Sequence, residues 1–269
     1  MKRIFAVLLA LSLLLLAACS KGVSPTEPSQ TEPATQAPTE PATDAPTEPS
    51  QTEPATEPSQ PTEEEGPFTV TYAHAQADTH GSGEVWVQLL AEVTNTGSEP
   101  LTLDAADWTV CTPDGTELAV RKGVSAYPQT IEPGEKGWYY DEFTVDTAQT
   151  GELAVQYDGD ALAASIRAAE QSGVRYAVSD VNLKDSVYGG VELTGRIRND
   201  TAEQGSLVCV AAVLLDESEK PLGVVYAVLG SPLEAGAETT FGMSSEMLPP
   251  EVKSADIAQV ETFAYPLAE

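Results

Sequence analysis

The sequence predicts an all-β protein with two tandem antiparallel β-sandwiches in residues 67–269. Short runs of alternating apolar and polar residues are separated by turn-forming clusters at regular intervals, which is the pattern of half-buried strands. One strand-and-turn pattern also occurs twice, and helical periodicity is almost absent. The stretch has room for two domains of about 100 residues each. Ahead of it lie an apolar N-terminal run and a segment rich in proline, threonine and glutamate.

The internal repetition sets the correspondence between the two modules. Residues Val87–Asn95 match Val191–Asn199, because both runs alternate apolar and mostly polar residues and then stop at an asparagine. The later landmarks are Asp114 and Gly134 in the first copy, and Asp216 and Gly236 in the second. The interval from aspartate to glycine is 20 residues in both copies. We therefore expect the two modules to share one strand order.

The boundaries follow from these landmarks. We expect a first module over residues 67–158, a connecting helix over 159–173 and a second module over 174–269. Asp160 is a candidate N-cap for the helix, and Gly173 is a candidate C-terminal stop.

Part of the second copy follows a known family pattern. The residues that carry it are Gly195–Asn199, the strand end Leu214–Asp216, and Leu233–Gly236 ahead of Thr240 and Phe241. On these residues the second module resembles the FxLYD family of bacterial surface domains, although Ala212 and Leu215 stand where that family has Phe and Tyr. The first module is similar to the broader immunoglobulin-like modules of secreted Gram-positive lipoproteins. The resemblance implies two small immunoglobulin-like antiparallel sandwiches, and the FxLYD family carries no known catalytic residue to transfer.

The N-terminus has the pattern of a secretion signal. Two basic residues precede the apolar run Ile4–Ala18, which is shorter than the roughly 20 residues that a membrane-spanning helix needs. The run ends in Leu16-Ala17-Ala18-Cys19, which is similar to the lipobox of bacterial lipoproteins. That resemblance implies removal of residues 1–18 and a diacylglycerol on Cys19, which would anchor the protein at the extracellular face of the cell membrane. The alternatives are an uncleaved anchor and a plain signal with an incidental cysteine.

Residues 19–66 are predicted to be a disordered acidic linker that starts at the lipidated cysteine. The stretch after Cys19 contains 10 prolines, 10 acidic residues and no aromatic residue, so it cannot bury a core that would offset the entropy of ordering. A long extended spacer suits a Gram-positive surface. A proline-motif ligand or an O-glycosylated stalk is the alternative interpretation.

The charge balance excludes one class of partner. Of the 42 acidic and 13 basic residues, 10 acidic and 3 basic precede residue 67, which leaves 32 and 10 and a net charge of −22. A surface of this sign repels phosphate backbones, so we expect no nucleic-acid partner. It also repels anionic lipid headgroups, so we expect the modules to stay off the bilayer that holds their anchor.

Candidates for catalysis or metal binding are few. His74 and His80 are the only histidines, and their spacing with Asp78 is not that of a recognised zinc site. We predict no enzyme activity, no cofactor and no metal. Cys111 and Cys209 lie one in each module. We expect buried thiols there, with a disulfide between the modules as the alternative.

One aromatic cluster is a candidate for binding. The odd-numbered residues from Val87 to Val93 should face the core, and the two-residue period then turns Trp86 and Leu90 the other way. The candidate binding face consists of Trp86, Leu90, Trp138 and Tyr140. An apolar face of this kind marks contact with a partner, with the second module or with a sugar. The alternative is that a neighbouring strand or loop covers it.

Taken together, these features predict a non-enzymatic lipoprotein. It would display two immunoglobulin-like modules for binding or spacing in the cell envelope. Its partners would be the membrane, through the N-terminal lipid, and an envelope protein or glycan. The alternative function is an accessory or substrate-binding subunit of an envelope enzyme or transport system.

Overall fold

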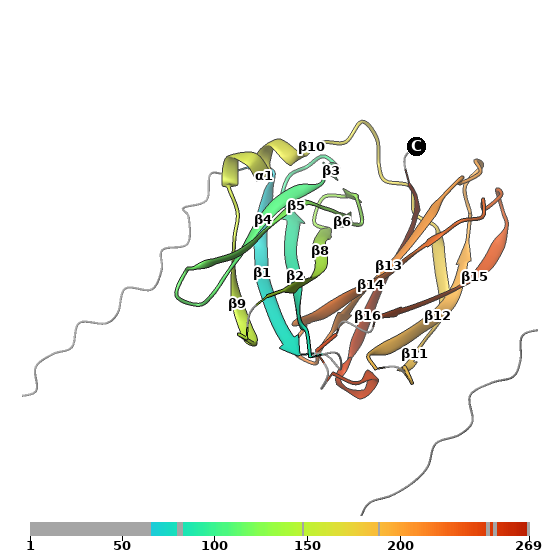
Figure 1. Cartoon of the computed structure of the whole chain (residues 1–269). Coiled ribbons are helices and arrows are strands. Elements are labelled where there is room, and N and C mark those ends of the chain that lie inside the picture. Colours follow the sequence, from blue (N-terminus) through green and yellow to red (C-terminus); the bar gives the residue numbers. More distant parts are fainter. Residues whose placement is uncertain are drawn as a thin grey trace, which may run out of the picture. The chain divides into compact units, whose positions relative to one another are not determined.

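The computed structural model describes residues 66–79, 83–146, 148–187, 189–245, 248–249 and 252–267, which belong to one compact unit. The predictions for the signal, for Cys19 and for the linker up to residue 65 lie outside these residues. The described chain is all-β, with antiparallel strands and a single short α-helix among its elements, as the sequence predicts (Figure 1).

The first half, up to Ala168, forms a seven-stranded and a three-stranded antiparallel sheet. The strand order in the large sheet is β5-β4-β9-β1-β2-β8-β6, and β10-β3-β7 form the small one. The strands are β1 (Phe68–Thr79), β2 (Val85–Asn95), β3 (Leu101–Leu103), β4 (Ala106–Cys111), β5 (Glu117–Val124), β6 (Ala126–Tyr127), β7 (Thr130–Ile131), β8 (Lys136–Val145), β9 (Gly151–Gln156) and β10 (Ile166–Ala168).

The second half forms two three-stranded antiparallel sheets, in the orders β11-β12-β15 and β14-β13-β16. Its elements are β11 (Ala177–Asp185), β12 (Val191–Arg198), β13 (Val208–Leu215), β14 (Pro221–Leu229), β15 (Glu238–Ser245), the 3₁₀ turn η1 (Ser254–Asp256) and β16 (Gln259–Pro266).

The two halves share one strand order, as the repeated sequence pattern predicts. The order β1-β2-β8 corresponds to β11-β12-β15, and β5-β4-β9 corresponds to β14-β13-β16. In the first half, β9 also pairs with β1 through Ala75 and Leu153, which joins the two layers into one curled sheet. The added strand β6 extends this sheet beyond β8.

Each half has its own apolar core. In the first, the odd-numbered residues of β2 from Val87 to Val93 face the core, as expected from their alternation. In the second, Val191, Leu193 and Ile197 of β12 occupy the corresponding places. The alternating pattern of the repeated strand therefore predicts correctly which side of each strand is inside.

The repeated asparagine is buried and fully hydrogen-bonded in both modules. Asn95 donates from Nδ2 to the carbonyl oxygens of Glu99 and Ile131, at 2.9 and 3.1 Å. Asn199 donates in the same way to Glu203 and Leu233, at 2.7 and 2.9 Å. Each asparagine thus satisfies two backbone carbonyl groups at the end of its strand, where no neighbouring strand supplies the donor.

The same asparagines also bind the turn that precedes the third strand of their sheet. The backbone amides of Gly134 and Gly236 donate to the carbonyl oxygens of Asn95 and Asn199, at 2.8 and 2.7 Å. Both glycines have positive φ angles, 82° and 73°, a conformation that disfavours other residues. The asparagine and glycine landmarks therefore mark one structural unit that is built twice. The aspartate landmark is wrong: by its backbone hydrogen bonds, Asp216 corresponds to Thr112 rather than to Asp114.

The predicted connecting helix over residues 159–173 is wrong in its extent. The helix α1 covers only Gly159–Ser165, and its N-cap is Asp158 rather than Asp160. Ile166 begins β10, which pairs with β3, and the Ile166 side chain is buried in the core. The helix therefore ends here, because strand pairing and core packing are favoured over a further helical turn. Within the described residues, no helix has the length and apolarity to cross a membrane.

Candidate functional site

Three of the four residues of the candidate binding face are buried between the two modules. Leu90, Trp138 and Tyr140 are only 3%, 1% and 5% exposed. They belong to one apolar cluster that also contains Val213, Leu215 and Val224 of the second module. The idea that these three residues meet an external ligand is therefore wrong. The contact with the second module, which the sequence left open, is what the structure contains.

The fourth residue of the set, Trp86, is half-buried and lies outside this cluster. It sits near the start of β2, four residues before Leu90. The sequence pattern therefore grouped residues with different surroundings.

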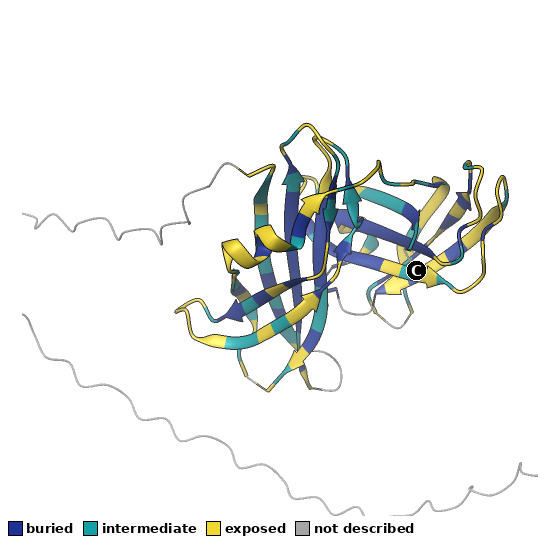
Figure 2. Ribbon diagram, turned by 90° about the horizontal axis from the view of Figure 1, so that it is seen from above, coloured by how far each residue is buried: buried dark blue, intermediate teal, exposed yellow. Residues whose placement is uncertain are grey.

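The inter-module face is possible because two strands are buried on both sides. In β2 the odd-numbered residues face the core and Leu90 faces the second module. All eight residues of β13 are buried, with Val210 in its own core and Val213 in the shared cluster. Figure 2 marks such buried residues in dark blue. The continuous apolar run Val208–Leu215 is the sequence signal for this contact, and sequence reasoning did not use it.

Repeat-equivalent positions show that the apolar contact belongs to one face of each module. Leu90 and Tyr140 pair across β2 and β8, and the equivalent pair on β12 and β15 is Thr194 and Gly242, both exposed. Val213 corresponds to Thr109 on β4, which is only partly buried. The first module thus contributes one of its sheet faces and the second module contributes the other. A contact between two different faces can repeat from one molecule to the next. Here the free outer faces carry Thr194 and Thr109 at the positions of Leu90 and Val213, and these polar residues do not favour such a repeat.

A polar group of three residues lies at the same face. Gln88 donates from Nε2 to the Tyr140 hydroxyl at 3.1 Å, and that hydroxyl donates to the carboxylate of Glu142. Burial raises the pKa of Glu142, and it raises the pKa of Tyr140 well above its usual value. Because the tyrosine stays protonated, it serves as a hydrogen-bond donor to the carboxylate throughout the neutral range.

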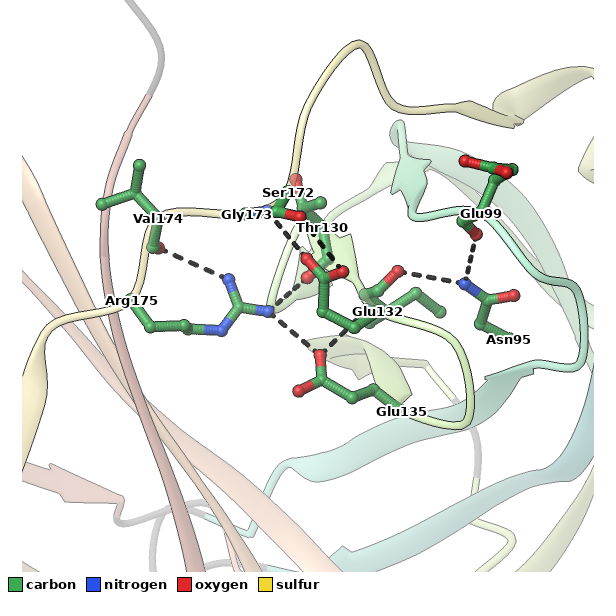
Figure 3. Close-up of polar contacts among 10 residues, drawn as sticks. Asn95, Glu99, Thr130, Glu132, Glu135, Ser172, Gly173, Val174 and Arg175 are labelled. Atoms are coloured by element: carbon green, nitrogen blue, oxygen red, sulfur yellow. Dashed lines mark hydrogen bonds and ion pairs between the residues drawn. The ribbon is translucent and has the colours of Figure 1, made fainter.

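The chain between the modules is held by side chains from the turn around β7 (Figure 3). The carboxylate of Glu132 accepts from the Gly173 amide at 3.0 Å and from the Ser172 hydroxyl at 3.4 Å. These bonds fix the end of the connecting segment against the first module.

Arg175 continues the same attachment toward the second module. Its guanidinium donates to the carbonyl oxygen of Thr130 and lies 3.6 Å from the Glu135 carboxylate. It also lies 5.9 Å from the ring centroid of Tyr265 on β16. Its side chain is 28% exposed, so these contacts are less screened than those of a surface ion pair. Arg175 therefore bridges a turn of the first module and a strand of the second.

The remaining candidate groups are separate from one another. His74 lies 3.2 Å from the Glu152 carboxylate, and burial lowers the pKa of the histidine. His80 lies outside the described residues. Cys111 and Cys209 are buried and unbridged, so the inter-module disulfide is excluded. In the part of the chain that the structure describes, no group of three metal-ligating side chains converges.

One recess lies beside the module junction. It has a volume of about 410 Å³, and its lining includes Gln129, Leu267 and the ion pair between Arg167 and Asp104. The guanidinium of Arg167 approaches the two carboxylate oxygens of Asp104 at 2.9 and 3.3 Å, and both side chains are about half exposed. The charged groups here satisfy each other and leave no unpaired charge for a ligand.

No family model matches the chain, and no curated protein matches it. Among solved structures, a calcium-binding mutant of Bacteroides uniformis β-glucuronidase 2 is 13% identical and covers 71% of this chain and 26% of that chain, with a TM-score of 0.22. A structure of Bacteroides uniformis β-glucuronidase is 12% identical over 72% of this chain and 24% of that chain, also at 0.22. The chain spans about a quarter of the length of these structures. Similarity this weak carries no argument about activity.

Proposed function

We propose that this protein is a lipoprotein, anchored through Cys19 at the extracellular face of the cell membrane, that displays two immunoglobulin-like modules as one coupled head. The lipobox-like Leu16–Cys19 and the acidic, proline-rich residues 19–66 support the anchor and the spacer. The observation that carries the proposal is the apolar cluster formed by Leu90, Trp138 and Tyr140 with the second module. The proposal includes no catalytic step.

A coupled head explains why the aromatic residues of the first module are used internally. Burying two aromatic side chains and a leucine contributes roughly 1.5–3 kcal/mol each. The polar attachment through Glu132 and Arg175 holds the connecting segment at a second place. A spacer or a display platform needs such fixed modules, because freely jointed ones would not keep a bound partner at a defined place.

The charge of the head supports its position away from the bilayer. The net charge of −22 over residues 67–269 repels the anionic headgroups of a membrane surface. The linker carries the same sign, so repulsion within it favours extended conformations. The lipid would hold one end of the chain at the membrane while the modules stay in solution.

Metabolic labelling with a fatty acid tests the anchor. The wild-type chain should take up label, and Cys19→Ala should not. Cys111→Ala is the matched control, because that thiol is buried in the first module and should not affect labelling. Equal labelling of the Cys19→Ala variant would overturn the proposed anchor.

A binding role is the second candidate, as an accessory or substrate-binding subunit of an envelope enzyme or transport system. One observation favours it: Tyr226 and Val228 are large apolar residues that remain 48% and 49% exposed beside the module junction. A spacer would gain nothing from exposing them.

A further inference from the structure

The last strand of one sheet has an open edge. β14 ends the order β14-β13-β16, and it pairs with β13 alone. The described residues supply no backbone partner for its other edge from Tyr226 to Leu229. Free amide and carbonyl groups along a strand are a template for another strand.

Other edge strands in the described structure carry the features that prevent such pairing. β5, the repeat equivalent of β14, has Arg121 and Lys122, and its register with β4 shifts twice. β11 has Asp180 and Lys184, and it shifts against β12. Charges and bulges of this kind block edge-to-edge association. β14 has no charged residue, and its register shift against β13 lies between Gly223 and Pro221, which leaves the pairing regular from Gly223 to Leu229.

The side chains along the open edge extend the inter-module face. Tyr226 and Val228 pair with Ala211 and Cys209, so they lie on the same face of the sheet as the buried Val213. The ring of Tyr226 stacks on Tyr127 of the first module, with centroids 4.9 Å apart and an angle of 27° between the planes. The apolar surface of Tyr226 and Val228 therefore continues the inter-module contact, and about half of each side chain is exposed to solvent.

The charges around this edge are acidic. From Asp216 to Thr240 the chain has five acidic residues and one basic residue, and all of them lie outside β14. Glu203 and Glu234 are exposed beyond the C-terminal end of the strand, and neither forms an ion pair with a described basic side chain. A basic residue of a partner would be favoured there, whereas a second copy of this chain would bring more negative charge.

We propose that the edge of β14 from Tyr226 to Leu229 binds, by strand addition, an extended apolar segment of a partner protein that is flanked by basic residues. This inference rests on the binding role in the proposed function and names the kind of partner. Backbone hydrogen bonds provide affinity along roughly 13 Å of strand, and alternate side chains of the segment pack on Tyr226 and Val228.

A synthetic peptide of alternating valine and threonine with one lysine at each end is the probe. We expect saturable binding to the full chain and slower hydrogen exchange of the amides from Tyr226 to Leu229. Val228→Lys should weaken binding at least tenfold, because it places a charge on the apolar edge. Val120→Lys on β5 is the matched control: that residue is 43% exposed on an edge that is already charged, and its substitution should leave binding unchanged.

A second peptide with glutamate in place of both lysines tests the charge requirement. It should bind at least fivefold more weakly at low salt. Equal binding of the two peptides, absent saturable binding, or an affinity that Val228→Lys leaves unchanged would overturn the proposal. So would concentration-dependent self-association that Val228→Lys abolishes, because a second copy would then occupy the edge. Fatty-acid labelling is measured separately and does not depend on any of these outcomes.

Discussion

Replacing Leu90 by alanine should weaken both modules together. The side chain is 3% exposed and is enclosed by Trp138 and Tyr140 on its own sheet and by Val213 on the other module. Leu→Ala substitutions at buried sites cost about 2–5 kcal/mol, with larger values where the surroundings cannot collapse into the cavity. Since two separately built sheets enclose the site, we expect a loss of about 3 kcal/mol, which is roughly a hundredfold change in the unfolding equilibrium.

The two modules can be followed by different signals. All three tryptophans lie in the first module, so tryptophan fluorescence during denaturant titration reports on that half. Hydrogen exchange of the β13 amides reports on the second half. In the Leu90→Ala variant, the fluorescence midpoint should fall and the β13 amides should exchange roughly a hundredfold faster.

The repeat supplies the control for this experiment. Thr194 occupies the equivalent position on β12 and is exposed, so Thr194→Ala should change the free energy of unfolding by less than about 0.5 kcal/mol. The reasoning would be refuted if Leu90→Ala lowered the fluorescence midpoint while the β13 amides kept their wild-type exchange rates. That result would mean that the modules unfold independently and that the apolar cluster does not couple them.

Three further predictions concern the buried asparagines, the joint and a histidine. Asn95→Asp and Asn199→Asp should each cost about 3 kcal/mol or more in a denaturant titration, because one buried and one part-buried carbonyl group lose their donor; a cost below about 1 kcal/mol would contradict this. Arg175→Ala should lower stability by about 1–3 kcal/mol and accelerate exchange at the connecting segment, whereas Arg167→Ala, in an exposed pair, should leave the midpoint nearly unchanged; equal effects of the two would argue against the bridge. Burial lowers the pKa of His74, so the unfolded state binds more protons below about pH 6.5, and acidification should cost wild type more stability than His74→Gln; identical pH slopes would disprove it.

The sequence predicts the fold well because the determining signals are local. Alternating residues, the terminal asparagine and the glycine turn recur in the same order in both copies, and each maps onto a strand or turn of both modules. The helix was overestimated because its continuation depends on a distant strand: Ile166 pairs with Leu103, more than 60 residues earlier in the chain. No local capping signal reveals that competition.

The candidate face was predicted in part. The two-residue period shows that Leu90 points away from its own core, and the structure agrees. What covers it depends on how two modules pack, which no pattern within β2 or β8 encodes. The apolar run Val208–Leu215 was the available signal, since a strand without polar positions must be buried on both faces. The open edge at Tyr226 depends on the strand order and requires the structure.

The contact between the modules has a consequence for the synthesis of the chain, because the apolar face of the first module is covered by strands that are made later. β8 ends at Val145, and the strands that cover its outer face, β13, β14 and β16, are complete only at Pro266, about 120 residues later. At about 5–20 residues per second, synthesis of these residues takes roughly 6–24 s, and a first module that folded within this interval would expose Trp138 and Tyr140 to its surroundings. A chain truncated in this interval would have a folded first module with an exposed apolar face, and such a face promotes aggregation. The order of synthesis therefore makes the first module dependent on the arrival of the second.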